Sequence, residues 1–457
     1  MSNNGALTQL VAVGAQEEEL LTNDPKFSVF QQNVGKMNNF VKSTTSNYSL
    51  GSSNWGTTLS FKVKKDGDML SSAYLVIELP ELSKSVLSDQ IADLNNFKVR
   101  WVDYLGYSIL ESAKLLIGGQ LIEEVTGDFS QIYTDLYEKE FNKICLLGMD
   151  PTLTTPQDTI RSTSLYVPLK FWFSENVSKA LPLIALQYHD VEFEIKLRKW
   201  EDIVQLLEEK TDSNGVKGLV HNPNYSIPEQ SIKDLRLDCN LLFLDSEDRK
   251  RVAQSEHKYL ITQTQRISHS VSQGKNIELN FNHPVKEMFF YLQNNFMRDN
   301  GELFNFSNKL DYPTVDMYNK TGFSFDSFTA SFKNHLLDKA RILINSYPRV
   351  EWKDFKYYYY LQNYENYRTK TEHLFYMYSF SANPKFKDPM GSLNFSRIDN
   401  AQLQFTLNED NINDFKSFLP TSLESKALSN NFDIVAYGVN YNYLRIAGGM
   451  AGVVYNN

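Results

Sequence analysis

The stretch VEFEIKLRK, residues 191–199, alternates apolar and charged side chains along most of its length. Its apolar members are Val191, Phe193, Ile195 and Leu197, and the charged residues between them are Glu192, Glu194, Lys196 and Arg198. Successive side chains of a β-strand point to opposite faces of the sheet, so this period of two places all four apolar residues on one side. The stretch therefore predicts a strand with one buried face and one face in water.

The same period of two recurs along the chain. It is present at Leu75, Ile77 and Leu79, at Leu235, Leu237, Cys239, Leu241 and Phe243, and at Leu403, Phe405 and Leu407. Between Lys114 and Glu123, the runs KLLI and QLIE flank Gly118 and Gly119. Paired glycines supply the positive φ angles of a two-residue turn, so this segment predicts a β-hairpin.

Helical patterns are few and short. Three segments carry one: the first follows Asp128 as N-cap with Phe129, Ile132, Tyr133 and Leu136, the second has Trp200, Ile203, Val204 and Leu207, and the third begins near Asp245 and Ser246 and turns Arg249, Lys250 and Arg251 outward. Many strands with few helices predict an all-β protein of antiparallel sandwiches with helices in the connections. The regular strand-helix alternation of a nucleotide-binding α/β sheet is missing from the sequence.

The length of 457 residues allows two or three domains. A hydrophobic content of 42% supplies their cores and excludes global disorder. The polar stretch at residues 213–228 contains glycines and prolines without a sustained period, which is typical of a linker. We expect an N-terminal arm at residues 1–24, a first sandwich at residues 25–212 and a second at residues 229–457.

Charge and cysteine usage limit the possible partners and compartments. Lys and Arg total 46 against 55 Asp and Glu, a net charge of -9 that disfavours a surface coating nucleic acid. Cys145 and Cys239 lie far apart and form no CxxC pair, so we expect neither a disulfide nor a zinc site. The first residues lack the pattern of a signal peptide, and no stretch approaches the ~20 apolar residues of a spanning helix. We expect a soluble protein made in the cytosol.

Motifs that carry chemistry are missing from the sequence. It contains no GxGxxG, no GxxxxGK[ST], no HExxH and no GxSxG. The histidines are scattered, and His189 is interpreted as structural rather than as a metal ligand. We therefore predict no catalytic, cofactor-binding or metal-binding residues. The pairs Glu123-Glu124 and Glu208-Glu209 are interpreted as solvated ends of a strand and a helix, although two carboxylates are all that a glycosidase needs.

Two further segments favour packing over chemistry. The run KYYYYLQNYENY, residues 356–367, is typical of a protein interface or core more than of a base-stacking platform, given the acidic charge balance. The closing segment LRIAGGMAGVVYNN, residues 444–457, is too apolar for a solvated tail. We expect its glycines to let the backbone pack closely against a neighbouring surface.

Longer blocks of the sequence resemble a known family. The run YVPLKFWFSENVSKALPLIALQYHDVEFEI, residues 166–195, is similar to the signature block of the major capsid proteins of nucleocytoplasmic large DNA viruses. Other blocks similar to the same family occur along the chain in the expected order, among them GDMLSSAYLVIELP, LFLDSEDRKRVAQSEHKYLI, LNFNHPVKEMFF and NYNYLRIAGGMAGVVYNN. Together these blocks span nearly the whole chain.

The resemblance implies two consecutive eight-stranded antiparallel jelly rolls and a homotrimer that forms a pseudo-hexagonal capsomer of an icosahedral shell. It implies a structural protein of the virion, assembled in the host cytoplasm, with no enzymatic activity and no cofactor. The implied partners are further copies of the chain, minor capsid and penton proteins, and an internal membrane reached only indirectly. Direct binding to nucleic acid is not expected.

Two other functions stay open on the sequence alone. One is a carbohydrate-binding or carbohydrate-active β-sandwich protein, since such sandwiches host glycosidases. The other is a minor or penton capsid protein, which is expected to have a single jelly roll. The length of 457 residues disfavours that second alternative.

Overall fold

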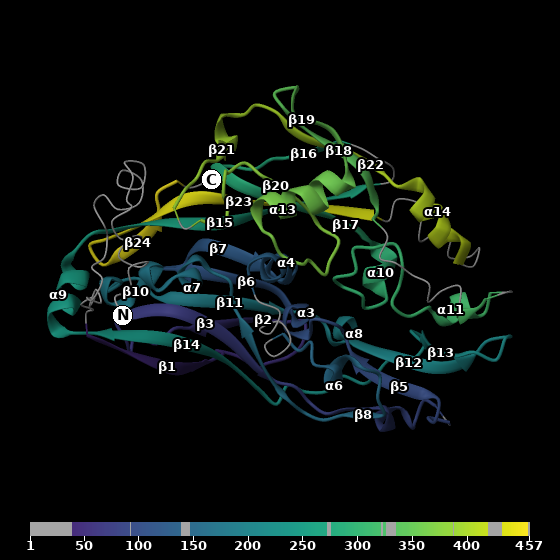
Figure 1. Cartoon of the computed structure of the whole chain (residues 1–457). Coiled ribbons are helices and arrows are strands. Elements are labelled where there is room, and N and C mark those ends of the chain that lie inside the picture. Colours follow the sequence, from purple (N-terminus) through teal and green to yellow (C-terminus); the bar gives the residue numbers. More distant parts are fainter. Residues whose placement is uncertain are drawn as a thin grey trace, which may run out of the picture. The chain divides into compact units, whose positions relative to one another are not determined.

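The structure is a computed structural model that describes residues 39–91, 93–138, 147–271, 276–320, 323–325, 335–386, 388–418 and 432–455. The expected N-terminal arm at residues 1–24 and Cys145 lie outside these ranges. Figure 1 shows the strands in two groups, β1 to β14 and β15 to β24. Each group is built from two larger sheets.

The first group forms a sandwich of two sheets. One sheet has the order β1-β14-β3-β10, with β9 also paired to β3, and its strands are β1 (Phe40–Tyr48), β3 (Met69–Glu78), β9 (Ser164–Pro168), β10 (Leu181–Pro182) and β14 (Asp234–Leu244). The other has the order β2-β11-β6-β7, and its strands are β2 (Thr58–Lys62), β6 (Leu110–Ile117), β7 (Gln120–Thr126) and β11 (Val191–Leu197).

The period of two in the sequence produces the core of this first sandwich. In β11 the apolar residues at positions 191, 193, 195 and 197 are buried, while the charged residues between them are exposed or half-buried. Phe193 packs its ring 5.5 Å from that of Phe171, and Leu75 of β3 is paired with Leu237 of β14. Burial of such side chains contributes about 1.5–3 kcal/mol each. The strand predictions are thereby confirmed.

Smaller elements extend the first sandwich. Its further strands are β4 (Leu82–Ser83) paired with β8 (Thr159–Ile160), and a sheet β13-β12-β5 made of β5 (Phe97–Trp101), β12 (Val204–Thr211) and β13 (Lys217–His221). Its helices are η2 (Lys84–Leu87), α3 (Leu105–Ile109), α4 (Gly127–Tyr137), α6 (Pro151–Thr154), α7 (Trp172–Glu175), η3 (Val177–Lys179), η4 (Leu183–Ala185) and α8 (Trp200–Ile203).

The second group repeats the arrangement. One sheet has the order β15-β23-β17-β20, with β21 on β17 and β24 on β23, and its strands are β15 (His257–Val271), β17 (Pro284–Asn294), β20 (Tyr376–Ser379), β21 (Leu393–Asn394), β23 (Phe432–Ala447) and β24 (Met450–Val453). The other has the order β16-β22-β18-β19, and its strands are β16 (Asn276–Glu278), β18 (Leu337–Ile344), β19 (Tyr347–Asp354) and β22 (Ala401–Leu407).

Helices occupy the connections of the second sandwich. They are α9 (Ser246–Gln254), α10 (Asn295–Asp299), α11 (Val315–Tyr318), the π-helical η5 (Tyr357–Leu361), α13 (Gln362–Asn366), η6 (Phe395–Arg397) and α14 (Glu409–Phe418). The core lies between the two sheets: the Tyr358 hydroxyl of η5 donates to the Ala340 carbonyl of β18 at 3.1 Å, and its ring lies 5.7 Å from Phe290 of β17. Within the described ranges, no helix has the length and apolar character to cross a membrane.

The expected domain boundary is corrected by the strand pairing. Residues 217–221 of the expected linker form β13, which pairs with β12. Strand β14 pairs with β3 from Asp234 opposite Glu78 to Leu242 opposite Met69. The prediction that the second sandwich begins at residue 229 is therefore wrong for β14, which belongs to a sheet of the first sandwich. A strand's own sequence does not encode its partner when that partner is more than a hundred residues away.

Two of the three helix predictions also need correction. Helix α4 is present, but its N-cap is Thr126, whose hydroxyl accepts from the Phe129 amide at 3.3 Å, and Asp128 lies inside the helix. Helix α8 ends at Ile203, and the chain from Val204 onward forms β12 because it pairs with β5. Helix α9 begins after Asp245 as predicted, and its basic residues at positions 249–251 are exposed.

The hairpin predicted at residues 118–119 is confirmed, and the glycines near the C-terminus form a second turn that was not predicted. Gly118 and Gly119 have φ angles of 59° and 78° and join β6 to β7. Near the C-terminus, Gly448 and Gly449 have φ angles of 60° and 80° and join β23 to β24. This last hairpin is packed rather than solvated, since the Tyr188 amide donates to the Gly449 carbonyl at 3.0 Å. A Cβ at position 449 would lie 2.7 Å from the Tyr188 ring.

Candidate functional site at the contact between the two sandwiches

Helix α4 of the first sandwich lies on the outer face of the second sandwich's sheet β15-β23-β17. The Phe129 ring is 5.5 Å from Tyr437 of β23 and 6.5 Å from Phe289 of β17. One helical turn further, Tyr133 stacks on Tyr137 with ring centroids 4.4 Å apart. Residues four apart share one face of a helix, so α4 presents a continuous aromatic stripe to the neighbouring sheet.

Polar side chains fix the start of α4 against the same sheet. Asp128 accepts from the Arg198 guanidinium at 2.9 Å and from the Tyr291 hydroxyl at 3.0 Å. The hydroxyls of Thr126 and Tyr437 are 2.6 Å apart. Burial, followed by the negative charge of Asp128, raises the pKa of Tyr291 well above its ordinary value. Tyr291 therefore stays protonated and donates to the carboxylate.

The neighbouring strands β7 and β15 are joined by side chain to backbone contacts. Gln263 of β15 donates to the Ile122 carbonyl, and Thr264 donates to the Glu124 carbonyl at 2.5 Å. Strand β7 is an edge strand of its sheet, with backbone groups available for bonding. Strand β15 of the second sandwich thus covers an edge of the first.

A second cluster is centred on Glu287 of β17. Its carboxylate accepts from the Tyr137 hydroxyl at 3.1 Å and also from the Tyr367 hydroxyl, and it pairs with Lys286 at 3.0 Å. Burial and then the Glu287 charge raise the pKa of both tyrosines well above the ordinary value. A cavity of about 450 Å³ lies beside this cluster, and Tyr137, Lys286 and Lys385 are among its lining residues.

A third contact joins Asp135 of α4 to His373, which precedes β20. The Asp135 Oδ2 and His373 Nδ1 atoms are 2.7 Å apart, and both side chains are almost fully buried. Gln131 donates to the second carboxylate oxygen at 3.2 Å. Rings of Tyr104 and Phe304 flank the imidazole at 4.5 Å and 6.1 Å. A buried pair of this kind is costly to break, because removing one partner leaves the other polar group buried without its hydrogen bond.

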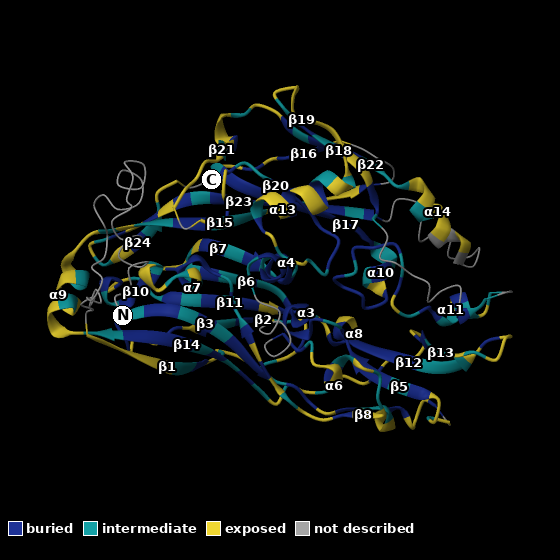
Figure 2. Cartoon of the chain, viewed as in Figure 1, coloured by how far each residue is buried: buried dark blue, intermediate teal, exposed yellow. Residues whose placement is uncertain are grey.

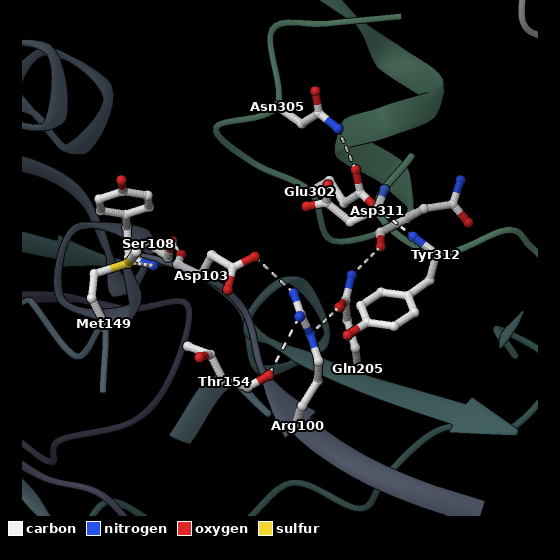
Figure 3. A network of polar contacts seen from close by, with 12 residues as sticks. Arg100, Asp103, Ser108, Met149, Thr154, Gln205, Glu302, Asn305, Asp311 and Tyr312 are labelled. Carbon is white, nitrogen blue, oxygen red and sulfur yellow. Dashed lines mark hydrogen bonds and ion pairs between the residues drawn. The ribbon is translucent and has the colours of Figure 1, made fainter. Parts of the chain in front are cut away.

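The far end of the contact is a polar network around Arg100 of β5 (Figure 3). Its guanidinium donates to Gln205 at 2.8 Å, to Asp103 at 3.0 Å and to the Thr154 carbonyl at 3.3 Å. Gln205 in turn donates to the Asn300 carbonyl, beyond α10 of the second sandwich, at 2.6 Å. The same guanidinium lies 4.9 Å from the centre of the Tyr312 ring.

Two titratable groups near this network have shifted pKa values. Burial, with repulsion from Asp311 second, raises the pKa of Glu302 to about 8, although Glu302 accepts from Asn305 at 2.5 Å. Burial lowers the pKa of His221 to about 4, and its ring bonds Asn300 at 3.2 Å. Both shifts follow from removing a charge from water. The contact between the sandwiches is thus formed by buried aromatic rings together with bonded polar groups.

The remaining sequence candidates do not join this site in a catalytic arrangement. His189 accepts from the Ala451 amide at 3.2 Å, a structural role. The interpretation of Glu123 as solvated is wrong: it is buried, and burial raises its pKa well above the ordinary value. Glu208 and Glu209 lie in β12 rather than at a helix end. Among the described residues, no group of three or more His, Cys, Asp or Glu is placed to hold a metal ion.

The tyrosine run divides between core and surface. Tyr358 is fully buried in the second sandwich, whereas Tyr360 and Tyr364 are 58% and 71% exposed. Figure 2 shows exposed stretches on the helix labelled α13. Sequence reasoning missed the aromatic stripe of α4 as a contact between domains, because its period of about four is equally typical of a helix that packs on its own core. It also missed Arg100 and Glu287, for which the sequence carries no local signal.

Comparison with known proteins identifies the chain. The family model described as large eukaryotic DNA virus major capsid protein matches residues 248–452, and the model of the major capsid protein N-terminus matches residues 28–245. The chain belongs to the family of major capsid proteins of large eukaryotic DNA viruses. The two matches meet at the start of α9, directly after β14, which agrees with the pairing of β14 in the first sandwich.

Relatives along the whole length agree with this family. The major capsid protein of Phaeocystis pouchetii virus is 27% identical, with 99% of this chain and 100% of the relative covered. That of Paramecium bursaria Chlorella virus 1 is 28% identical, with the same coverage of both chains. Among solved structures, a chain of the quasi-atomic model of the PBCV-1 virus capsid superposes with a TM-score of 0.73 at 25% identity, covering 94% of this chain and 100% of that one.

The family settles the fold and the broad function. This capsid protein is a double jelly roll with a structural role in the capsid of a virus particle, as the sequence resemblance implied. Both main sheets of each jelly roll run through four strands, and the short strands β9, β21 and β24 pair beside that path. No finding favours the carbohydrate-active alternative.

Proposed function

We propose that this capsid protein assembles as a homotrimer whose six jelly rolls make a pseudo-hexagonal capsomer, and that such capsomers tile an icosahedral shell. The observation that supports this most directly is the pair of sandwiches with matching strand orders, held together in one chain by a buried contact. Three such chains around a threefold axis present six similar walls, which fits a hexagonal array.

The strand pairing indicates where each jelly roll begins and ends. The first jelly roll ends with β14, α9 is the connection, and the second begins with β15. The N-terminal arm at residues 1–24 stays a proposal based on the sequence. The surfaces that bind other copies of the chain, minor capsid proteins and penton proteins lie on the outside of both rolls.

The protein is further proposed to act without catalysis and without a cofactor, because a shell requires fixed geometry rather than a reactive group. Its place is the virion, with assembly in the host cytoplasm. An internal membrane is reached only through other proteins. The net charge of -9 supports a shell that encloses nucleic acid without binding it directly.

The mass of the purified protein tests the proposal. Light scattering is expected to give a stable species of three times 52.8 kDa, and negative-stain electron microscopy is expected to show hexagonal particles with threefold symmetry. A species that stays monomeric across assembly conditions of salt, pH and concentration contradicts the homotrimer. Particles of another symmetry contradict the pseudo-hexagonal capsomer.

A further inference from the structure

The two jelly rolls carry equivalent elements in equivalent order. In the first roll, the hairpin β6-β7 ends the sheet β2-β11-β6-β7 and leads into α4. In the second roll, the hairpin β18-β19 ends the sheet β16-β22-β18-β19 and leads into η5 and α13. The sheets β1-β14-β3 and β15-β23-β17 correspond in the same way. Each surface of the first roll therefore has a counterpart on the second.

Within one chain, the hairpin and helix of the first roll contact the sheet β15-β23-β17 of the second roll. Strand β7 and helix α4 of the first roll meet the outer face of β15-β23-β17, and Phe129 of α4 is only 4% exposed as a result. The equivalent surfaces, which are the hairpin and helices of the second roll and the sheet β1-β14-β3 of the first, do not meet within one chain. Seven of the eight residues of β19 are exposed, and so are residues 41–44 of β1.

The exposed counterpart of α4 has the same aromatic character. Along η5 and α13, Tyr360 and Tyr364 are 58% and 71% exposed, and they are four residues apart like Phe129 and Tyr133. Together with Tyr357 and Lys356 they line a shallow hollow of about 590 Å³. Large exposed aromatic side chains gathered at one place mark an interaction surface.

We propose that this tyrosine face, formed by β19, η5 and α13, docks on the outer face of the sheet β1-β14-β3 of a second copy of the chain. The inference rests on the proposed trimer and names the surfaces that form it. This contact between two chains is equivalent to the contact that α4 makes between the two rolls of one chain. The same rotation therefore relates each roll to the next. Such a head-to-tail contact closes into a ring when the rotation closes.

The outer face of β1-β14-β3 suits this partner. Thr44 and Ser46 of β1 bond Asn240 and Asp238 of β14 at 2.6 Å each, which fixes the orientation of this polar face. Because side chains alternate, Tyr48 shares the face of Ser46 and is 62% exposed. Tyr166 of β9, which is 45% exposed, adds an aromatic ring.

Two surface variants test the docking. The helix-face variant is Tyr360→Ala with Tyr364→Ala, and the sheet-face variant is Tyr48→Ala with Tyr166→Ala. Each alone is expected to lower the trimer fraction at least tenfold at a fixed concentration, measured by native mass spectrometry, because central aromatic residues dominate interfaces. Tyr188→Ala is the matched control, since Tyr188 is 76% exposed but lies on neither surface. Far-UV circular dichroism spectra are expected to match the wild type, because all four substituted rings are exposed.

Mixing the two variants distinguishes head-to-tail docking from other contacts. One intact helix face then meets one intact sheet face, so a dimer of twice 52.8 kDa is expected and the ring cannot close. Full trimers in both variants overturn the inference and assign the tyrosine face to another partner, while the proposed trimer stands. Variants that are monomeric and stay monomeric on mixing also overturn it. A monomeric wild type overturns the trimer and this inference together.

Discussion

At the scale of single residues, His221 shows how the contact between the rolls depends on pH. It ends β13, its ring bonds Asn300 at 3.2 Å, and its amide donates to the Pro313 carbonyl at 2.7 Å. Burial lowers the pKa of His221 to about 4, against 6.5 for a free histidine. The folded chain therefore holds this ring neutral at a pH where the unfolded chain already protonates it.

The sign of the pH dependence follows from that difference. Between about pH 6.5 and pH 4 the unfolded state binds the proton and the folded state does not, so stability is full above pH 6.5 and falls as the pH drops towards 4. We predict that His221→Gln, which keeps a donor for Asn300, reduces this acid loss by on the order of 2–3 kcal/mol. Urea midpoints at pH 7 and pH 4.5 measure it.

His269→Gln is the control for this substitution, because His269 is exposed on β15. It is expected to leave the wild-type loss unchanged. The burial of His335, whose pKa is also lowered to about 4, leaves part of the acid sensitivity in both variants. Equal losses in His221→Gln and wild type contradict the assignment.

At the scale of elements, the start of α4 depends on the absence of a side chain at Gly127. A Cβ there would lie 2.2 Å from the Leu110 carbonyl oxygen and 2.3 Å from that of Tyr107. Both obstacles are backbone, which cannot swing away. We predict that Gly127→Ala lowers the free energy of unfolding by more than about 2 kcal/mol, through a shift of α4 off the second roll. Denaturant melts measure the loss.

Gly51→Ala serves as the control, because no atom lies within 4 Å of a Cβ at that position. Its expected effect is within about 0.5 kcal/mol of the wild type. A Gly127→Ala variant as stable as Gly51→Ala contradicts the close approach of the three backbone segments.

The same helix shows what a sequence can and cannot predict. The period of two predicted the strands β3, β11, β14 and β22, and the period of about four predicted α4, because both are local properties of the chain. The N-cap at Thr126 was missed because Asp128, an equally good capping residue, instead bonds Arg198 and Tyr291 from distant segments. The site at the contact depends on such distant partners throughout, so single residues such as Glu287 gave no signal. The family, in contrast, was recognisable from long sequence blocks.

The C-terminal hairpin is a second element with a measurable role. Strand β24 pairs with β23 from Met450 to Val453, and Ala451 is buried and donates to His189 of the first roll at 3.2 Å. We predict that deleting the chain from Gly448 onward lowers the melting temperature by several degrees or prevents trimer formation, because β23 loses a partner and the first roll loses a contact. Soluble trimers with an unchanged melting temperature contradict this role.

At the scale of the whole molecule, the two rolls form one body because their contact is buried and bonded along its length. Successive parts of this contact are formed by the aromatic stripe of α4, the Glu287 cluster, the pair of Asp135 and His373, and the Arg100 network. Helix α9, which connects the two rolls, has no buried residue among its nine, and it contacts the first roll through the ion pair of Arg249 with Asp68 at 3.0 Å. The geometry that a shell protein requires is therefore held by side chains rather than by the linker.

Cleavage of α9 tests that conclusion. A protease site placed within residues 246–254 is expected to be cut in the native protein, after which both fragments still elute together at the size of the intact species, because the aromatic and polar contacts remain. Size-exclusion chromatography with denaturing gels of the peak measures this. The matched control carries Phe129→Ala and Tyr437→Ala, which empty the centre of the contact, and its cleaved halves are expected to separate. Wild-type fragments that separate in native buffer show that the linker, and not the contact, holds the two rolls in place.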